Sequence, residues 1–398
     1  MLSYRKLAMR VLGHPLHTGG GNGSPRPASQ RAAAFILTAA MLTTLAAPAF
    51  AKTWHIEDGD ITVKAGETKG TNKVSQGANQ EVEDTDTIIT NREAKASSNT
   101  VTIEAEKKDD KVEVTLKDVN IDTSSRNKAA VSVTGEGDTN IKLNGDNALK
   151  SDIYRSGIYG SGSGSLTISG GENDSLTAQG GAGGNGISSS GNLTISGGTV
   201  TANGDDGGSG IYSRGGVTIS GGSTVTANGG SGTISGGDGI CSSGGVTISG
   251  GSTVTANGGD GKNGSGGSGI FSLGRVAISG STVNAAGGSS SRNGGSGIYS
   301  SGIDLSGSLE LTAKAGKGTQ SNGKALSQNG RELDLDAIKD KLDPGAKVTT
   351  TDADGKVIDQ VPIPRPVEPE ESSSSSDGGS SAPSAPASPL PGLTVTDK

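Results

Sequence analysis

Short runs of alternating apolar and polar residues recur along residues 157–302, each bounded by glycine or a Ser-Gly pair. A period of two with many β-branched residues predicts short strands that bury one face. One run begins with Gly-Ile, and its isoleucine recurs at steps of 29, 24, 29, 30 and 28 residues. A period in this range predicts a solenoid. The recurring isoleucines are Ile158, Ile187, Ile211, Ile240, Ile270 and Ile298.

Each repeat holds two further runs, of which Val217–Ile219 and Val225–Ala227 are examples. Three strands per repeat predict a three-sided coil, with each strand pairing in parallel with its equivalent in the next coil, about 4.8 Å away. The pattern extends upstream with less glycine, and Val131 takes the isoleucine position of an earlier coil. We therefore expect an all-β, right-handed parallel β-helix over residues 106–328, with about 7–8 three-strand coils.

The two ends of the repeat array differ from it in composition. Residues 52–105 are more charged and irregular, and we expect them to form an N-terminal cap over the open coil end. Residues 329–361 predict a C-terminal cap, made of a short helix that begins at Asp334 and a hairpin that turns at Asp352–Gly355. Residues 362–398 are rich in Pro and Ser without periodicity, which predicts disorder.

The first 51 residues have the organisation of a secretory signal peptide. Basic residues precede an apolar run over residues 32–47, and Ala49-Phe50-Ala51 then forms a small-x-small cleavage pattern. A transmembrane anchor is the competing interpretation, but the run is shorter than the roughly 20 residues that a spanning helix needs. We expect cleavage after Ala51, a location outside the cell or on its surface, and no membrane insertion of the mature chain.

Composition narrows the partners and the sources of stability. Hydrophobic residues make up only 30% of the chain, but 69 glycines bring the total close to that of globular proteins. Removal of residues 1–51 takes away five basic residues and no acidic ones, so the formal charge goes from −7 to −12. An acidic surface argues against nucleic acid as a partner. Cys241 is the only cysteine, so no intrachain disulfide can form.

The residue after each recurring isoleucine should point outward, which predicts a column of side chains along one face. Rings two coils apart lie about 9.6 Å from each other, close to the length of a disaccharide, and flat rings with polar tips suit stacking on sugars. The alternative is that the rings shield the strands and pack on one another. The predicted carbohydrate-binding residues are Tyr159, Tyr212, Phe271 and Tyr299, and Ser188 and Cys241 complete the column.

The segment between the third strand and the next Gly-Ile varies in length, and such a corner of a solenoid often carries function. Four aspartates fall on this side, and Gly180–Ser188 follows a calcium-binding nonapeptide pattern with Asn in place of Asp. They are candidates for a calcium site; the alternative is that they are solvated loop acids. An asparagine column at Asn203, Asn228 and Asn257 should tie stacked turns together. The four aspartates are Asp205, Asp206, Asp238 and Asp260.

The sequence does not predict an enzyme. Secreted parallel β-helices that cleave acidic polysaccharides use close carboxylates, or a calcium ion with a basic residue. All three histidines, His14, His17 and His55, lie outside the coils, and Asp205 and Asp206 are neighbours whose side chains tend to point apart in an extended segment. A polysaccharide lyase or hydrolase is therefore the least favoured function.

Several segments resemble the clostridial β-helical carbohydrate-binding domain family, over roughly residues 101–326. The resemblance is carried by Val114–Ile121, Ala129–Val133, Ser165–Gly171 and Gly197–Asn203. It implies an extracellular polysaccharide-binding module of a secreted bacterial surface protein, with plant cell-wall glucans or polygalacturonate as ligands and calcium as a bound ion. The alternative of another class is a non-catalytic adhesive or structural solenoid that binds a host protein or itself.

Overall fold

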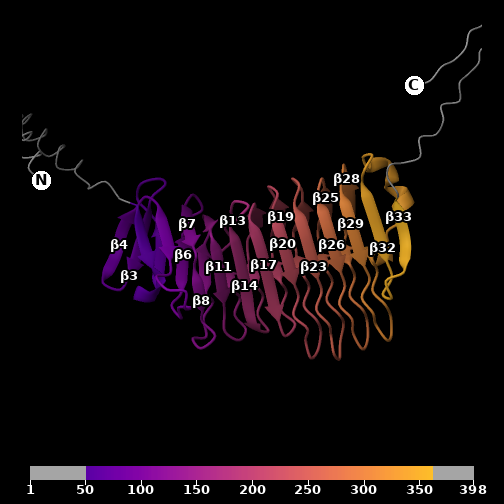
Figure 1. Cartoon of the computed structure of the whole chain (residues 1–398), viewed down its shortest axis with the longest axis horizontal. Coiled ribbons are helices and arrows are strands. Elements are labelled where there is room, and N and C mark those ends of the chain that lie inside the picture. Colours follow the sequence, from indigo (N-terminus) through magenta and orange to yellow (C-terminus); the bar gives the residue numbers. More distant parts are fainter. Residues whose placement is uncertain (1–50, 362–398) are drawn as a thin grey trace, which may run out of the picture.

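A computed structural model describes residues 51–361, so the predicted signal peptide and the predicted disordered tail lie outside the described residues, apart from Ala51. The described chain winds into a parallel β-solenoid of about nine turns, elongated along one axis (Figure 1). Three parallel sheets form its sides. The predicted all-β architecture of three-strand coils is therefore confirmed, with more turns than expected. Within residues 51–361, no helix has the length and apolar character needed to cross a bilayer.

The first sheet contains the Leu/Val-Thr-Ile runs, and equivalent residues pair, as in Leu193 with Val217. In spatial order its strands are β1 (Lys52–His55), β5 (Thr87–Thr90), β7 (Lys111–Lys117), β10 (Asp138–Asn144), β13 (Leu166–Ser169), β16 (Leu193–Ser196), β19 (Gly216–Ser220), β22 (Gly245–Ile248), β25 (Arg275–Ser279) and β28 (Gly302–Ser306).

The second sheet contains the third run of each repeat, and Val225 pairs with Val254 in the predicted register. In spatial order its strands are β33 (Val357–Val361), β32 (Lys347–Thr351), β29 (Glu310–Lys314), β26 (Thr282–Ala286), β23 (Thr253–Asn257), β20 (Thr224–Asn228), β17 (Thr199–Asp205), β14 (Ser175–Ala182), β11 (Asp146–Lys150) and β8 (Asn120–Asp122).

The third sheet contains the Gly-Ile runs, with Val131 paired to Ile158 as predicted. In spatial order its strands are β31 (Arg331–Glu332), β30 (Leu326–Gln328), β27 (Ile298–Ser300), β24 (Ile270–Ser272), β21 (Ile240–Ser242), β18 (Ile211–Ser213), β15 (Ile187–Ser189), β12 (Ile158–Gly160), β9 (Val131–Gly135), β6 (Val101–Ala105), β2 (Ile61–Ala65), β3 (Asn72–Gln76) and β4 (Asn79–Asp84).

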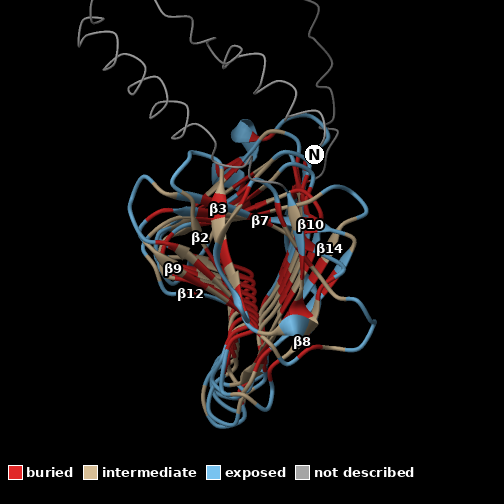
Figure 2. Cartoon of the chain, turned by 90° about the vertical axis from the view of Figure 1, so that its left-hand side faces the viewer, coloured by how far each residue is buried: buried red, intermediate tan, exposed pale blue. Residues whose placement is uncertain are grey.

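The core is a set of aliphatic columns that run the length of the solenoid. The end-on view shows buried residues along the strands and exposed residues in the outer loops (Figure 2). All six recurring isoleucines are fully buried, at 0% exposure. Each turn stacks its apolar residues on those of its neighbours, so burial in one turn depends on the next. The array is thus the folding unit, because a single turn cannot bury enough apolar area by itself.

The N-terminal segment departs from the prediction of a separate cap over residues 52–105. Strands β1 and β5 pair in parallel with each other, and β2 pairs in parallel with β6, so this segment already forms solenoid turns. Its charged loops of irregular length hide the period in the sequence. The added cap is the hairpin β3–β4, which extends the third sheet in antiparallel fashion beyond β2.

The C-terminal segment covers the last turn with the predicted hairpin. Strand β32 continues the second sheet in parallel, and β33 returns antiparallel to it after a turn in which the Gly355 amide donates to the Asp352 carbonyl. The predicted short helix is replaced by two 3-10 turns, Leu335–Ala337 and Lys339–Lys341. Asp334 still caps the first of them, since its side chain accepts a hydrogen bond from the Asp336 amide. One further 3-10 turn, Ile56–Asp58, follows β1.

Candidate functional site

The predicted aromatic column lies on the outer face of the third sheet. Tyr159, Tyr212, Phe271 and Tyr299 are the middle residues of three-residue strands whose flanking residues are buried. Strand pairing places them in one line with Ser188 and Cys241. Tyr159 is 45% exposed and the other three rings are partly buried. The column therefore exists in the expected register.

The structure brings together only two of the four rings. Phe271 and Tyr299 stack with their centroids 5.1 Å apart and their planes 7° from parallel. Each ring therefore covers one face of the other, as the alternative of mutual packing predicts for this pair. The turns that carry Ser188 and Cys241 separate Tyr159 from Tyr212 and Tyr212 from Phe271. These separations leave gaps of two strand spacings in the column, about 9.6 Å from ring to ring.

Tyr159 borders a shallow hollow of about 350 Å³ between the loops before β9 and β12. Lys128 and Arg155 contribute its basic groups. The Lys128 Nζ lies 3.1 Å from the Asp60 carboxylate, and the Arg155 Nε donates to the Asn127 Oδ1 at 3.1 Å. The surroundings of Tyr159 thus offer both an open surface and hydrogen-bonding groups.

Asp238, one of the four calcium candidates, is a structural acid. Its carboxylate accepts a hydrogen bond from the Ser268 amide at 2.7 Å and interacts with the Cys241 thiol. Burial raises the pKa of Asp238 to about 6, against these two hydrogen bonds, which lower it. Burial, together with the nearby Asp238 carboxylate, likewise raises the pKa of the Cys241 thiol to about 12. The Asp238 carboxylate therefore links its own turn to the next turn, which contains Ser268.

Of the remaining aspartates, Asp205 ends strand β17, whereas Asp206 and Asp260 lie on loops; two of the three carboxylates accept hydrogen bonds from backbone amides. The Asp205 carboxylate accepts from the Asp206 amide, and the Asp260 carboxylate accepts from the Ser289 amide at 2.7 Å. Among the residues that the structure describes, no three His, Cys, Asp or Glu side chains gather closely enough to hold a metal ion. Calcium binding at these residues stays a prediction that the arrangement does not test.

The asparagine column forms the predicted ladder. The Asn228 Nδ2 donates to the Asn203 Oδ1 at 2.9 Å, and the Asn257 Nδ2 donates to the Asn228 Oδ1 at 2.9 Å. These amides tie three consecutive turns together at the end of the second sheet. Their side-chain amides thus stabilise the stacking of the turns, as predicted.

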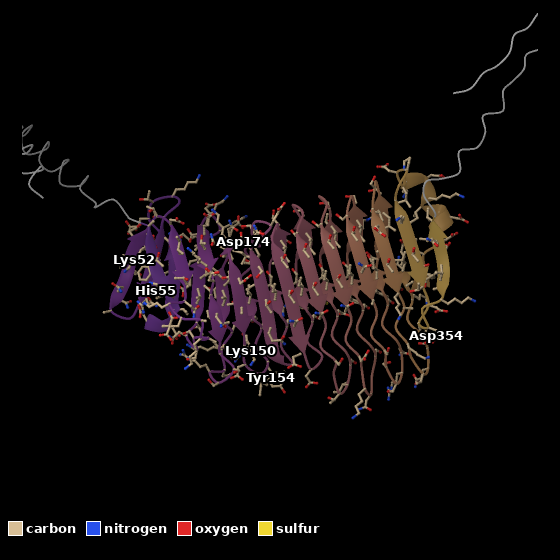
Figure 3. All side chains as sticks on the ribbon, viewed as in Figure 1. Lys52, His55, Lys150, Tyr154, Asp174 and Asp354 are labelled. Carbon is tan, nitrogen blue, oxygen red and sulfur yellow. The ribbon has the colours of Figure 1, made fainter. Side chains whose placement is uncertain are left out.

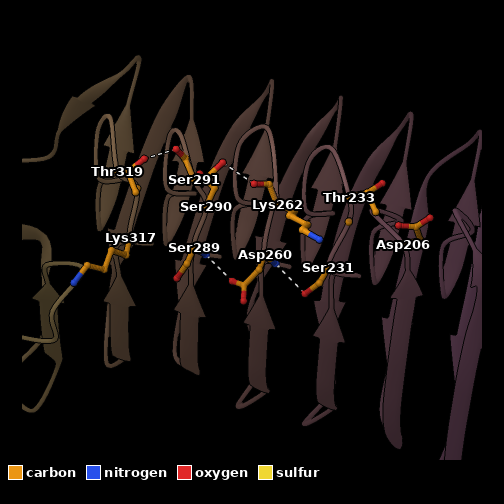
Figure 4. Close-up of a pocket in the computed structure, with 13 residues that line it drawn as sticks. Asp206, Ser231, Thr233, Asp260, Lys262, Ser289, Ser290, Ser291, Lys317 and Thr319 are labelled. Carbon is orange, nitrogen blue, oxygen red and sulfur yellow. Dashed lines mark hydrogen bonds between the residues drawn. The ribbon is translucent and has the colours of Figure 1, made fainter.

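The corner after the second sheet carries a groove that the residue patterns did not resolve. Its volume is about 660 Å³, and it is lined in successive turns by Asp206, Ser231, Asp260, Ser289 and Lys317 (Figure 4). The Ser231 hydroxyl accepts from the Asp260 amide at 3.1 Å, and the Ser291 hydroxyl donates to the Lys262 carbonyl at 2.6 Å. The unequal lengths of the loops at this corner were the only sequence feature that indicated a functional surface there.

Comparisons with known proteins add no family to this description. No family model matches the chain, and no match was found among curated proteins or among solved structures. The resemblance to the clostridial carbohydrate-binding domain family therefore stays a prediction from the sequence.

Proposed function

We propose that this chain is a non-catalytic, extracellular polysaccharide-binding module of a secreted surface protein. The proposal is carried by the aromatic column, which presents Tyr159, Tyr212, Phe271 and Tyr299 in one line on the outer face of a regular sheet. A line of rings parallel to the solenoid axis suits a polymer, because successive sugars can meet equivalent contacts in successive turns.

The gaps in the column at Ser188 and Cys241 indicate where sugar rings would bind. A spacing of about 9.6 Å between ring centres accommodates one further flat ring between two aromatic rings, at ordinary stacking distances. A sugar over Ser188 would contact Tyr159 and Tyr212, and a sugar over Cys241 would contact Tyr212 and Phe271. Tyr212 borders both gaps, so its loss should weaken binding more than the loss of Tyr299.

Affinity electrophoresis in gels that contain soluble polysaccharides tests the proposal, with and without calcium. The chain should be retarded by at least one glycan, and a Tyr212→Ala/Phe271→Ala double variant should be retarded less, while its circular dichroism spectrum and cooperative unfolding show that it stays folded. Undiminished retardation of the double variant would overturn the role of the column.

The second candidate function is an adhesive or structural solenoid that binds a host protein or another copy of itself. The stacking of Phe271 on Tyr299 favours this function, because each ring already covers one face of the other without a bound sugar. This function predicts no glycan affinity. Sedimentation velocity would then reveal self-association that the Tyr212→Ala/Phe271→Ala double variant weakens, whereas a glycan-binding module leaves its sedimentation unchanged.

A further inference from the structure

A second hollow adjoins the groove on the loop corner. It has a volume of about 560 Å³ and is lined by residues of earlier turns, from Ser124 and Lys150 through Gln179 to Asp205. The first groove begins at Asp206, the next residue in the chain. The second hollow lies at the ends of second-sheet strands, and the first lies on the loops that follow the later strands of this sheet. The two hollows thus follow one another along the solenoid axis, and together we name them the loop-corner groove.

Part of the wall of the loop-corner groove is itself in register. Parallel bridges link Gly232 to Gly261, Gly261 to Ser290, and Ser290 to Gly318. Hydrogen bonds from side chains strengthen this register (Figure 4). The Asp260 amide donates to the Ser231 hydroxyl, and the Thr319 hydroxyl donates to the Ser291 carbonyl. The loops are thus held at one strand spacing, about 4.8 Å per turn. A groove built in this way presents repeated hydroxyl and backbone groups to an elongated ligand.

Tyr154 lies in the loop between β11 and β12, at the lower edge of the solenoid near Lys150 (Figure 3). Its side chain is 79% exposed, yet its backbone has a φ of 58°, which is unfavourable for a residue with a bulky side chain. A Cβ atom on Gly183 would lie 2.6 Å from the tyrosine ring, so the ring rests on a glycine of the next turn. Packing in the core does not require this exposed ring, and strain of this kind is common at functional sites.

The charges around the groove indicate which ligands it can take. The two hollows contain four acidic and three basic side chains. Two of the basic groups are paired outside the groove, since Lys150 contacts Asp122 at 3.2 Å and Lys317 contacts Asp354 at 2.8 Å. The four aspartates then outnumber the one remaining lysine, so the groove has a net negative charge that disfavours binding of a polyanion. The acidic residues are Asp152, Asp205, Asp206 and Asp260, and the third base is Lys262.

We infer that the loop-corner groove binds an uncharged polysaccharide laid along the solenoid axis, with Tyr154 stacking on one of its sugar rings. This inference rests on the proposed function, glycan binding, but it places a second site at a different edge of the solenoid from the aromatic column. Hydroxyl groups along the groove would exchange hydrogen bonds with sugar hydroxyls turn by turn. The Tyr154 ring lies beside the groove, because Ile153 lines the second hollow and the ring rests on Gly183, which follows the lining residue Ala182. Its exposed face would anchor the chain at one end.

Two variants of the full chain test the groove. Tyr154→Gly removes the ring and also relieves the positive φ, so the variant should be at least as stable as the unchanged chain. Thr233→Trp places a large side chain at an exposed position that lines the groove. Tyr154→Phe is the control for Tyr154→Gly, because it keeps the aromatic ring. Thr247→Trp is the control for Thr233→Trp, because it adds the same bulk at an exposed position of β22 on the first sheet, away from the groove.

The probes are a soluble mixed-linkage glucan, a galactomannan and polygalacturonate, measured by affinity electrophoresis. We expect binding to a neutral glycan that weakens about tenfold, or about 1.4 kcal/mol, in Tyr154→Gly and in Thr233→Trp. Both controls should bind as the unchanged chain does. Polygalacturonate should be retained less than the neutral glycans.

Three results would overturn the inference in distinguishable ways. Loss of binding only in the Tyr212→Ala/Phe271→Ala double variant would support the proposed function and reject the groove. Preference for polygalacturonate would reject an uncharged ligand. Absence of binding to every glycan would reject the proposed function and the groove together.

Discussion

The Oδ1 atom of Asp238 accepts a hydrogen bond from the Ser268 amide at 2.7 Å, and Asn185, two turns earlier, makes the same bond at 2.7 Å to the Ser209 amide. The two side chains occupy equivalent positions, immediately before a Gly-Ile pair. A neutral amide and a carboxylate thus perform the same structural task. They differ in the cost of burying a charge.

This relationship predicts that Asp238→Asn stabilises the chain at neutral pH. Burial raises the pKa of Asp238 to about 6 in the folded state, above its ordinary value of 3.8, so the folded protein binds the extra proton more tightly than the unfolded chain does. The unfavourable contribution of Asp238 to the stability of the chain should therefore decrease as the pH falls from 7 towards 4. The free energy of unfolding of the variant should exceed that of the unchanged chain by about 2 kcal/mol at pH 7. This is less than the energy that corresponds to the whole pKa shift, because the Asp238 side chain is only partly buried.

Urea unfolding of both proteins between pH 4 and pH 8 measures this difference. The gain should shrink as Asp238 becomes protonated and should vanish near pH 4. A gain that stays constant across this range would show that the charge of Asp238 is not its cause.

A second prediction concerns the glycine that precedes each recurring isoleucine. A Cβ atom on Gly239 would lie 2.6 Å from the Gly269 carbonyl oxygen and 2.7 Å from the Asn257 nitrogen. Gly239→Ala should therefore cost about 3 kcal/mol, because the backbone of two neighbouring segments must move. Gly251, with a φ of 75° and no atom within 4 Å of its Cβ position, is the control. Gly251→Ala should cost about 1 kcal/mol, and equal costs in urea unfolding would refute the crowding argument.

The asparagine ladder gives a third prediction. Asn228→Ala removes both side-chain bonds and leaves an acceptor on Asn203 and a donor on Asn257 without partners. We expect a loss of about 1–2 kcal/mol in the free energy of unfolding. Thr226→Ala, at the outward position two residues earlier on β20, should change stability by less than about 0.5 kcal/mol. A similar loss in both variants would mean that the ladder does not stabilise the turns.

The stacked pair Phe271 and Tyr299 should be energetically coupled. A double-mutant cycle with Phe271→Ala and Tyr299→Ala should give a coupling of about 1 kcal/mol in thermal or urea unfolding. Tyr159 and Phe271 lie four turns apart in the column, so the corresponding cycle should give no coupling. Additive effects for the adjacent pair would contradict the stacked arrangement.

The repeat could be predicted because the inward isoleucines recur with a constant relation to glycine, and in-register stacking then follows for every turn. The N-terminal turns escaped prediction because their loops are charged and unequal, so that β1 and β2 show no period. The positive φ of Tyr154 and the contact of its ring with Gly183 could not be predicted, because no residue pattern in the sequence indicates either of them. The loop-corner groove arises only when loops of different length stack, so the sequence indicated its corner but not its walls.

Binding of the unchanged chain to an array of soluble and insoluble polysaccharides tests the central claim most directly. A polysaccharide-binding solenoid should show saturable binding to at least one glycan, with retention that competing soluble glycan of the same kind reverses. Absence of saturable binding to every polysaccharide, by a chain that unfolds cooperatively and is therefore intact, would contradict the account and favour an adhesive or structural solenoid.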